Sequence, residues 1–309
     1  MVNFRFSGHE TFPCRYTWLP KAYAALESNP NALVDDEHAM ISLGVGKNMV
    51  RAIRFWIRVG GVAEPGKGGS FDLTDFGRAI FSKNGFDPFL EDIRTLWLIH
   101  WQFSTNVNDP LFAWYYLLNR WQYPEFSRSK ILSVFRQESG RLGRELSEVT
   151  LEQHFDTFLH TYVPTRGRKG EILEDNLDCP LVELELIQKV GEHKVDNSGK
   201  REVIYAFRRE EKPEITPELF FYCIDDFWKK RRGNEMTLSF RDISASEGSP
   251  GQILKLPESD IRERLENIEI DSGGVFTYRE SFSLQQLARS RVPPGNLLPA
   301  IFNFETYDA

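Results

Sequence analysis

The side chains best placed for chemistry in this sequence form a basic group at helical spacing. They are Lys47, Asn48, Arg51, Arg54 and Arg58. No Asp or Glu occurs between Lys47 and Val59, so we expect one exposed helix face with four cations and one amide. Cations bind phosphates, and Arg, Lys and Asn side chains also read base edges. This pattern predicts contact with double-stranded DNA.

Further cations lie in two glycine-containing segments. Lys67 stands in the run Pro65–Gly69, where we expect it to reach the DNA backbone or the minor groove. Arg166, Arg168 and Lys169 form a second basic loop, which is either a DNA contact or a soluble connector. A third cluster, residues 229–232, ends a predicted helix, and compensation of the helix dipole explains it more simply.

Residue types used in catalysis occur without the spacing that catalysis needs. His9, Glu10 and Cys14 are possible zinc ligands, but no fourth ligand is evident, and a buried, hydrogen-bonded His9 is the favoured interpretation. The acid pairs at 91–92 and 225–226 lie at or within predicted helices, where we expect solvated or capping roles. The sequence has no GxSxG motif, and the run GVGKN lacks the rest of a phosphate-binding loop. We expect no enzyme, no metal and no cofactor.

The basic face requires a helix with a buried opposite side. Met49, Val50, Ile53, Trp56 and Ile57 recur at spacings of three and four and predict that side. Helices are expected before it at 11–27 and 36–43, with a tight turn at Gly44 and Gly46. After it, residues 60–73 predict a hairpin with a glycine-rich tip, and Thr74 caps a short helix to Phe81. This order is typical of a winged helix.

The remaining sequence predicts two similar units. Aromatic helices at 91–103 and 110–121 form a connector, and helices at 130–137 and 150–162 precede strands at 181–189 and 201–209. A helix at 216–232, short helices at 240–244 and 258–269, and a hairpin follow. We expect a mainly α (α+β) fold of tandem winged-helix-like units. The expected segments are 1–104, 105–232 and 233–309.

Composition places limits on function and location. The chain has 309 residues and a net charge of −7, so DNA contact must be confined to local patches. Its three cysteines contain no CxxC pair, which fits a reducing compartment and excludes a zinc ribbon. No apolar run reaches membrane-spanning length and no signal peptide is evident, so we expect a cytoplasmic protein without membrane contact.

Several longer motifs carry a family resemblance. They are FSGHETFPCRYTWLPKAY, LGVGKNMVRAIRFW, LTDFGRAI, LEDIRTLWLIHWQF, LDCPLVELELI and GSPGQILKL. Together they resemble the bacterial domain-of-unknown-function family 4007. The resemblance implies a place beside phosphoadenosine-phosphosulfate-reductase-like proteins, in loci for DNA phosphorothioation or phage defence. It supplies no catalytic residue.

These observations favour a non-enzymatic DNA-binding accessory subunit that positions partner enzymes of such a system on DNA. One alternative is a protein-interaction adaptor for a sulfotransfer or ATPase partner without direct DNA contact. The net acidity and the acidic helix at 258–269 favour it. Another is a transcriptional regulator of the locus, for which we expect a symmetric dimer and a palindromic site.

Overall fold

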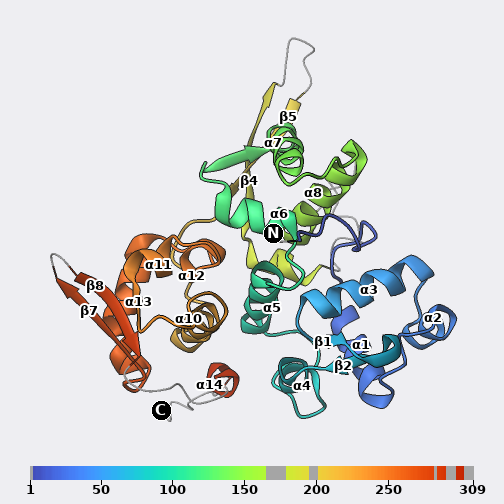
Figure 1. The fold of residues 1–309 in the computed structure, drawn as a ribbon, viewed down its shortest axis with the longest axis horizontal. Helices are drawn as coiled ribbons and strands as arrows, with labels where there is room; N and C mark the ends of the chain where they lie inside the picture. The colour runs from blue at the N-terminus through green and yellow to red at the C-terminus, as the bar shows by residue number, and fades with distance from the viewer. Residues whose placement is uncertain (1–2, 165–178, 195–200, 282–283, 290–296, 303–309) are drawn as a thin grey trace. The chain divides into compact units, whose positions relative to one another are not determined.

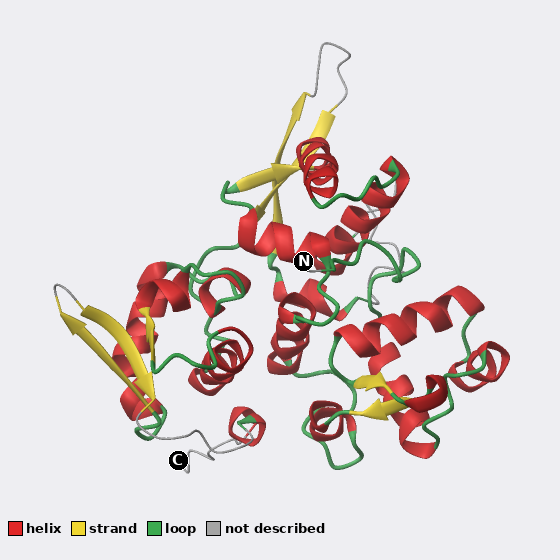
Figure 2. Cartoon of the chain, in the orientation of Figure 1, coloured by secondary structure: helices red, strands yellow, loops and turns green. Residues whose placement is uncertain are grey.

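A computed structural model describes residues 3–164, 179–194, 201–281, 284–289 and 297–302 (Figure 1). The chain forms two compact units. Unit 1 contains residues 1–117 and 121–208, and unit 2 contains residues 118–120 and 209–309. Both units are mainly helical with small antiparallel sheets (Figure 2), so the expected α+β class is confirmed.

Unit 1 begins with three helices and a hairpin. The elements are α1 (Trp18–Ser28), α2 (Asp36–Leu43), α3 (Lys47–Val59), β1 (Ala63–Pro65), the 3-10 turn η1 (Lys67–Gly69), β2 (Phe71–Leu73) and α4 (Asp75–Phe81). Strands β1 and β2 pair antiparallel, with Ala63 opposite Leu73. The hydroxyl of Thr74 accepts a hydrogen bond from the amide of Gly77 at 2.9 Å, which confirms the expected cap of α4.

The rest of unit 1 is built around buried aromatic helices. Its elements are α5 (Ile93–Thr105), α6 (Phe112–Tyr115), the π-helical turn η2 (Tyr116–Arg120), β3 (Glu125–Ser127), α7 (Arg128–Arg141), α8 (Glu148–Tyr162), the 3-10 turn η3 (Pro180–Leu184), β4 (Ile187–Lys194) and β5 (Arg201–Phe207). The last three residues of η2 belong to unit 2. Trp97, Trp101 and Trp114 are fully buried, as expected for the aromatic connector. The sheet has the order β3-β5-β4.

Unit 2 repeats that strand order. Its elements are α10 (Pro217–Arg231), β6 (Thr237–Ser239), α11 (Phe240–Ser244), α12 (Pro250–Ile253), α13 (Glu258–Asp271), β7 (Phe276–Ser281), β8 (Leu284–Arg289) and α14 (Leu298–Phe302). The sheet order is β6-β8-β7, so in both units a short first strand pairs with the last strand of a hairpin. Thr216 caps α10 and accepts from the amide of Leu219, as expected.

Some element boundaries differ from the sequence predictions. The strand expected at 181–189 is the turn η3 followed by β4, because Pro180 starts the turn and Glu185 ends it with a left-handed φ of 46°. The helix expected at 110–121 is the short α6 continued by η2. Strands β3 and β6 were not predicted, since three residues carry too little alternation to identify a strand.

The three expected segments are a different division from the two compact units. Helix α10 was expected in the segment 105–232, whereas it belongs to unit 2. The boundaries at 104/105 and 232/233 remain a prediction of three smaller domains within the chain.

Candidate nucleic-acid interface

The turn between α2 and α3 is formed by two glycines, as the sequence predicts. Gly44 ends α2 with a φ of 68°. Glycine adopts this left-handed conformation at little energetic cost because it has no Cβ. Its amide donates to the carbonyl of Met40 at 3.0 Å. Gly46 is the N-cap residue of α3. The two helices are therefore joined by one short, fixed turn.

Helix α3 buries more of its circumference than expected. Val50, Ile53, Trp56 and Ile57 are buried as predicted, and Phe55 is buried as well. Met49, predicted in the same stripe, is only half-buried, because it lies in the first turn of the helix. The indole N–H of Trp56 donates to the carbonyl of Phe12 at 3.0 Å. The outward face of α3 is consequently narrow.

Arg54 does not belong to an exposed cationic face. Its guanidinium donates to the carbonyl oxygens of Leu33 at 2.5 Å and Val34 at 3.2 Å, and to the carboxylate of Asp36 at 2.6 Å. Only 21% of the side chain is exposed. These contacts tie α3 to the segment before α2, which is a structural role that the sequence analysis did not expect.

Arg58 is likewise engaged within unit 1. It forms an ion pair with Asp109, and the same carboxylate accepts from Arg5 Nε at 2.5 Å. The expectation that these side chains belong to one exposed cationic face is therefore wrong for Arg54 and Arg58. The neutralising acids come from other parts of the chain and not from α3 itself, so the sequence of α3 gives no sign of them.

Three predicted residues remain exposed at the first turns of α3: Lys47, Asn48 and Arg51. Lys47 Nζ lies 3.2 Å from Asp36, and among the described residues no ion pair is recorded for Arg51. Hydrogen bonds from Arg54 and then Lys47 lower the pKa of Asp36, despite a smaller opposing effect of burial. An exposed pair such as Lys47–Asp36 is screened by solvent and contributes little, so Lys47 can exchange this carboxylate for a phosphate at small cost.

Lys67 lies at the exposed tip of the β1–β2 hairpin, as expected. No ion pair of this side chain is recorded in the described parts of the chain. The hairpin also carries the exposed acids Glu64 and Asp72. Its potential is therefore less positive than its glycine and lysine content indicates.

The two other basic clusters have different outcomes. Arg166, Arg168 and Lys169 lie outside the described residues. All four cations at the end of α10 are paired with carboxylates, Lys229 with Asp225 at 2.6 Å and Lys230 with Asp226 at 2.8 Å among them. A role at the end of α10 within the protein therefore explains this cluster without a contact to DNA.

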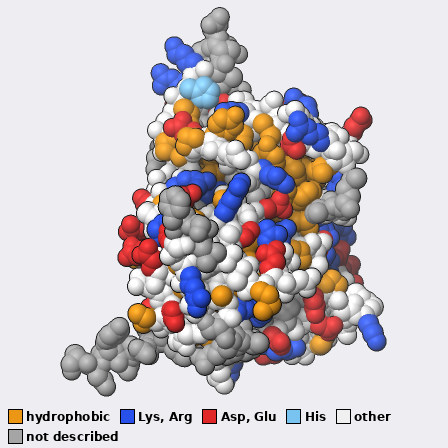
Figure 3. Space-filling view, turned by 60° about the vertical axis from the view of Figure 1, so that its left-hand side comes forward, with side chains coloured by type: hydrophobic (Ala, Val, Ile, Leu, Met, Phe, Trp, Pro, Cys, Tyr) orange, Lys and Arg blue, Asp and Glu red, His pale blue; other side chains and the backbone are white. Residues whose placement is uncertain are grey.

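Charges of both signs are interspersed on the surface drawn in Figure 3. Helix α8 shows the same mixture, since its Glu148 pairs with Arg136 and its Asp156 with Arg128. Helix α13 exposes mainly acids. Of these three helices, α3 has the most cationic exposed face.

A buried histidine pair is the main feature that sequence reasoning missed. His9 Nε2 lies 3.2 Å from His154 Nδ1, and the amide of Ala113 donates to His154 Nε2 at 2.9 Å. The hydroxyl of Thr157 donates to the carbonyl of Gln153 at 2.8 Å and lies 3.2 Å from His9 Nδ1. The sequence predicted burial of His9, but nothing in it identifies a partner so distant along the chain.

Each ring of this pair accepts a hydrogen bond from a backbone amide. The amide of Thr11 donates to His9 Nδ1 at 3.1 Å, as the amide of Ala113 does to His154 Nε2. A ring nitrogen that accepts an N–H carries no proton, and a charged imidazole has protons on both nitrogens. Both rings are therefore neutral. Burial lowers the pKa of His9 to about 4 and that of His154 well below its usual value.

The family of the chain is shown by comparison with known proteins. The family described as "Protein of unknown function (DUF4007)" matches residues 6–300. The chain belongs to this family, which confirms the resemblance drawn from its motifs. No curated protein matches the sequence.

Two solved structures share the fold. A magnesium ion-bound SspB crystal structure is 27% identical, with a TM-score of 0.79, covering 93% of this chain and 84% of the other. A second SspB crystal structure is 25% identical, with a TM-score of 0.80, covering 94% and 86%. In the described part of this chain, no three His, Cys, Asp or Glu side chains are grouped to hold a metal ion. No helix within the described ranges is both long and apolar enough to cross a membrane.

Proposed function

We propose that this protein is a non-enzymatic, DNA-binding accessory subunit of a bacterial DNA phosphorothioate modification or phage-defence system. It binds double-stranded DNA and positions partner enzymes there. The observation that carries the proposal is the group of exposed polar residues, Lys47, Asn48 and Arg51, at the start of the second helix of a helix-turn-helix pair. In such motifs the first residues of the second helix contact base edges.

The revised site is smaller than the sequence indicated, and its position supports the proposal. Arg54 and Arg58, which are used within the protein, lie one and two turns further along α3. The exposed residues lie at the N-terminal end, where the helix dipole also favours a phosphate. Lys67 on the neighbouring hairpin adds a backbone contact in the manner of a wing.

The order of elements supports a winged-helix interpretation of three segments. Helices are followed by a hairpin in α2–α3–β1–β2, in α7–α8–β4–β5 with the turn η3 before β4, and in α11–α12–α13–β7–β8. The two later sets share one strand order. Of the three, the first has the most cationic second helix, so we place the DNA contact there.

The family resemblance supports the biological context. It implies loci for DNA phosphorothioation or phage defence, with a phosphoadenosine-phosphosulfate-reductase-like protein as a partner in the cytoplasm. The three cysteines Cys14, Cys179 and Cys223 are buried and form no disulfide, which agrees with a reducing compartment. The sulfur chemistry belongs to the partner in this proposal.

A protein-interaction adaptor is the second candidate, and α13 is the observation that favours it. This helix exposes Glu258, Glu263, Glu266 and Glu269, together with Ile270, whose side chain is 84% exposed. A surface of this kind repels phosphates. The adaptor function predicts a complex with a neighbouring gene product that charge reversal of α13 abolishes, and no affinity for duplex DNA.

Fluorescence anisotropy with a labelled duplex tests the main proposal. We expect binding at low salt, and about tenfold weaker binding for Arg51→Ala, which corresponds to about 1.4 kcal/mol. Arg241→Ala, an exposed arginine on α11, is the matched control and is expected to bind like the wild type. Absence of duplex binding at low salt would overturn the proposal.

The non-enzymatic part of the proposal needs its own check because one similar structure holds magnesium. A supercoiled plasmid is incubated with the protein in Mg²⁺ or in a chelator. We expect the plasmid to stay supercoiled in both. Nicking or cleavage that depends on Mg²⁺ would show that the protein is an enzyme.

A further inference from the structure

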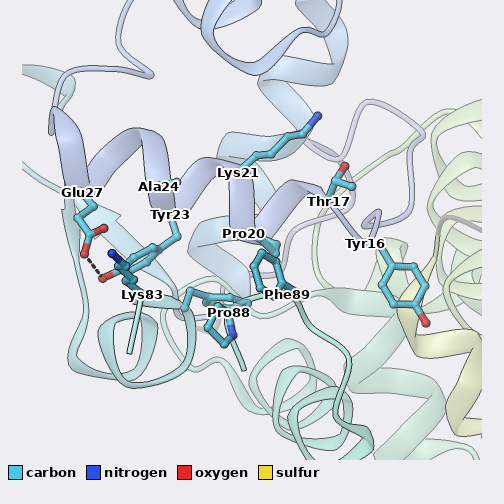
Figure 4. A pocket seen from close by; sticks show the side chains of 11 residues that line it. Tyr16, Thr17, Pro20, Lys21, Tyr23, Ala24, Glu27, Lys83, Pro88 and Phe89 are labelled. Carbon is cyan, nitrogen blue, oxygen red and sulfur yellow. Dashed lines mark hydrogen bonds between the residues drawn. The ribbon is translucent and has the colours of Figure 1, made fainter. Parts of the chain in front are cut away.

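An apolar groove of about 510 Å³ lies along α1 in unit 1, separate from the candidate DNA-binding residues. Its floor and walls come from α1, the end of α4 and the segment that follows α4. Pro20 of α1 lies beside Phe89, with Tyr23 on one side and Tyr16 on the other (Figure 4), and Ala24 and Pro88 also line the groove. The size is that of a site for several apolar side chains or a small ligand.

The segment that forms one wall is fixed by its own hydrogen bonds. The buried carboxylate of Asp87 accepts from the amides of Glu91 at 2.9 Å and Asp92 at 3.0 Å. The amides of Phe86 and Asp87 donate to carbonyl groups of α4 at 2.9 and 3.0 Å. This arrangement holds Phe89 with 72% of the residue exposed. A rigidly presented, exposed aromatic residue is typical of an interface anchor, because little conformational entropy is lost when it is covered.

The rim of the groove is cationic. Lys21 and Lys83 are exposed, and among the described residues neither has a recorded ion pair. The one acid of the lining, Glu27, accepts a hydrogen bond from the hydroxyl of Tyr23 at 3.0 Å. Two ammonium groups outnumber the one carboxylate among the lining side chains. A second carboxylate, that of Glu183, accepts a hydrogen bond from Tyr16 at one end of the groove. The positive potential is therefore local to Lys21 and Lys83.

We propose that this α1 groove is a docking site for an acidic, amphipathic segment of a partner protein. Apolar anchors of that segment would cover Phe89, Pro20 and Ala24, and its carboxylates would pair with Lys21 and Lys83. The smooth α1 surface at Pro20 and Ala24 suits a helix or an extended strand laid along it. A nucleic acid fits less well, because an apolar lining offers its phosphates no contacts beyond the two lysines. This inference is independent of DNA binding by α3.

A subtractive peptide selection tests the proposal. A phage-displayed library of random peptides of about 16 residues, long enough for about four helical turns, is selected on the full chain and depleted on Ala24→Glu. Ala24 is exposed, so this change fills the groove and adds a negative charge without disturbing the core. We expect the recovered peptides to combine Leu, Phe or Trp with Asp and Glu.

Recovered peptides are then measured by fluorescence anisotropy against variants. We expect at least tenfold weaker binding to Ala24→Glu and to Lys21→Glu/Lys83→Glu. Ser28→Glu places the same charge on α1 outside the groove. This variant is expected to bind the peptides within about twofold of the wild type, well below the tenfold effect expected for the groove variants. Circular dichroism checks that every variant is folded.

Each of the following results would overturn the proposal. The selection yields no peptide that depends on Ala24, or the dependent peptides are neutral or basic. Peptides bind equally to Ser28→Glu and Ala24→Glu. A single-stranded thymidine oligonucleotide binds the groove and is displaced by none of the selected peptides, which would assign the groove to a nucleic acid.

Discussion

At the scale of single residues, the main result is that chemically similar arginines have different roles. Arg51 is exposed, whereas Arg54 holds two carbonyl groups and the Asp36 carboxylate. Their spacing on α3 is that of neighbours on one face, so the sequence assigned them the same role. The carbonyl groups that bind Arg54 belong to Leu33 and Val34. Every residue has such a carbonyl group, so the sequence does not indicate which of them accepts a hydrogen bond from an arginine.

This difference predicts unequal effects of two alanine substitutions on stability. Arg54→Ala is expected to lower the free energy of unfolding by about 1–3 kcal/mol, because charge-assisted hydrogen bonds are lost. Arg51→Ala is expected to change it by less than about 0.5 kcal/mol, as for other exposed sites. Urea unfolding measures both. Equal destabilisation by the two changes would contradict the assignment.

The buried histidine pair predicts a loss of stability in acid. Both folded-state pKa values lie below the unfolded value of about 6.5, that of His9 at about 4. Between these values the unfolded chain binds protons that the folded chain does not. The free energy of unfolding should therefore fall as the pH decreases from about 6.5 to about 4.

Urea unfolding at pH 7 and pH 5 measures this effect. His38→Gln, a change at an exposed histidine, is the control and should leave the pH dependence unchanged. A free energy of unfolding that is the same at both pH values would show that the pair does not hold the neutral state inferred from its hydrogen bonds.

At the level of elements, the sequence predicted helices correctly where the apolar periodicity extended over several turns and capping residues marked the ends. Helix α3, the cap of α4 at Thr74 and helix α10 have the predicted positions. The prediction failed for the three-residue strands β3 and β6 and for the π-helical turn η2. Such elements depend on tertiary pairing and not on local pattern, so a single sequence contains little sign of them.

The packing of α4 against the hairpin predicts the effect of one glycine substitution. A Cβ on Gly77 would lie 2.3 Å from the carbonyl oxygen of Val62, a contact that the structure has no room for. Gly77→Ala is expected to lower the free energy of unfolding by about 1–3 kcal/mol, as overpacking does. Thermal or urea unfolding gives the value.

Gly140→Ala is the matched control for Gly77→Ala. Gly140 lies in α7 with open space around it, so alanine there is expected to stabilise the protein by about 0.5–1 kcal/mol through helix propensity. If both substitutions had the same effect, the close approach of α4 to Val62 would not be the cause.

At the scale of the whole molecule, the charge distribution limits how DNA is bound. The net charge is −7, and the candidate interface within the described residues retains three exposed cations, Lys47, Arg51 and Lys67. Each phosphate contact contributes about −0.9 to the slope of log K against log salt concentration. We expect a slope of about −3 from binding measured at several salt concentrations. A slope twice as steep would require further contacts outside this site.

The most direct test of the account is a charge reversal at Arg51, measured by fluorescence anisotropy with duplex DNA. Arg51→Glu and the control Arg241→Glu change the net charge of the chain equally, but only the first alters the exposed start of α3. We expect Arg51→Glu to abolish duplex binding at low salt and Arg241→Glu to retain it. Equal binding by the two variants would show that α3 is not the DNA-binding element.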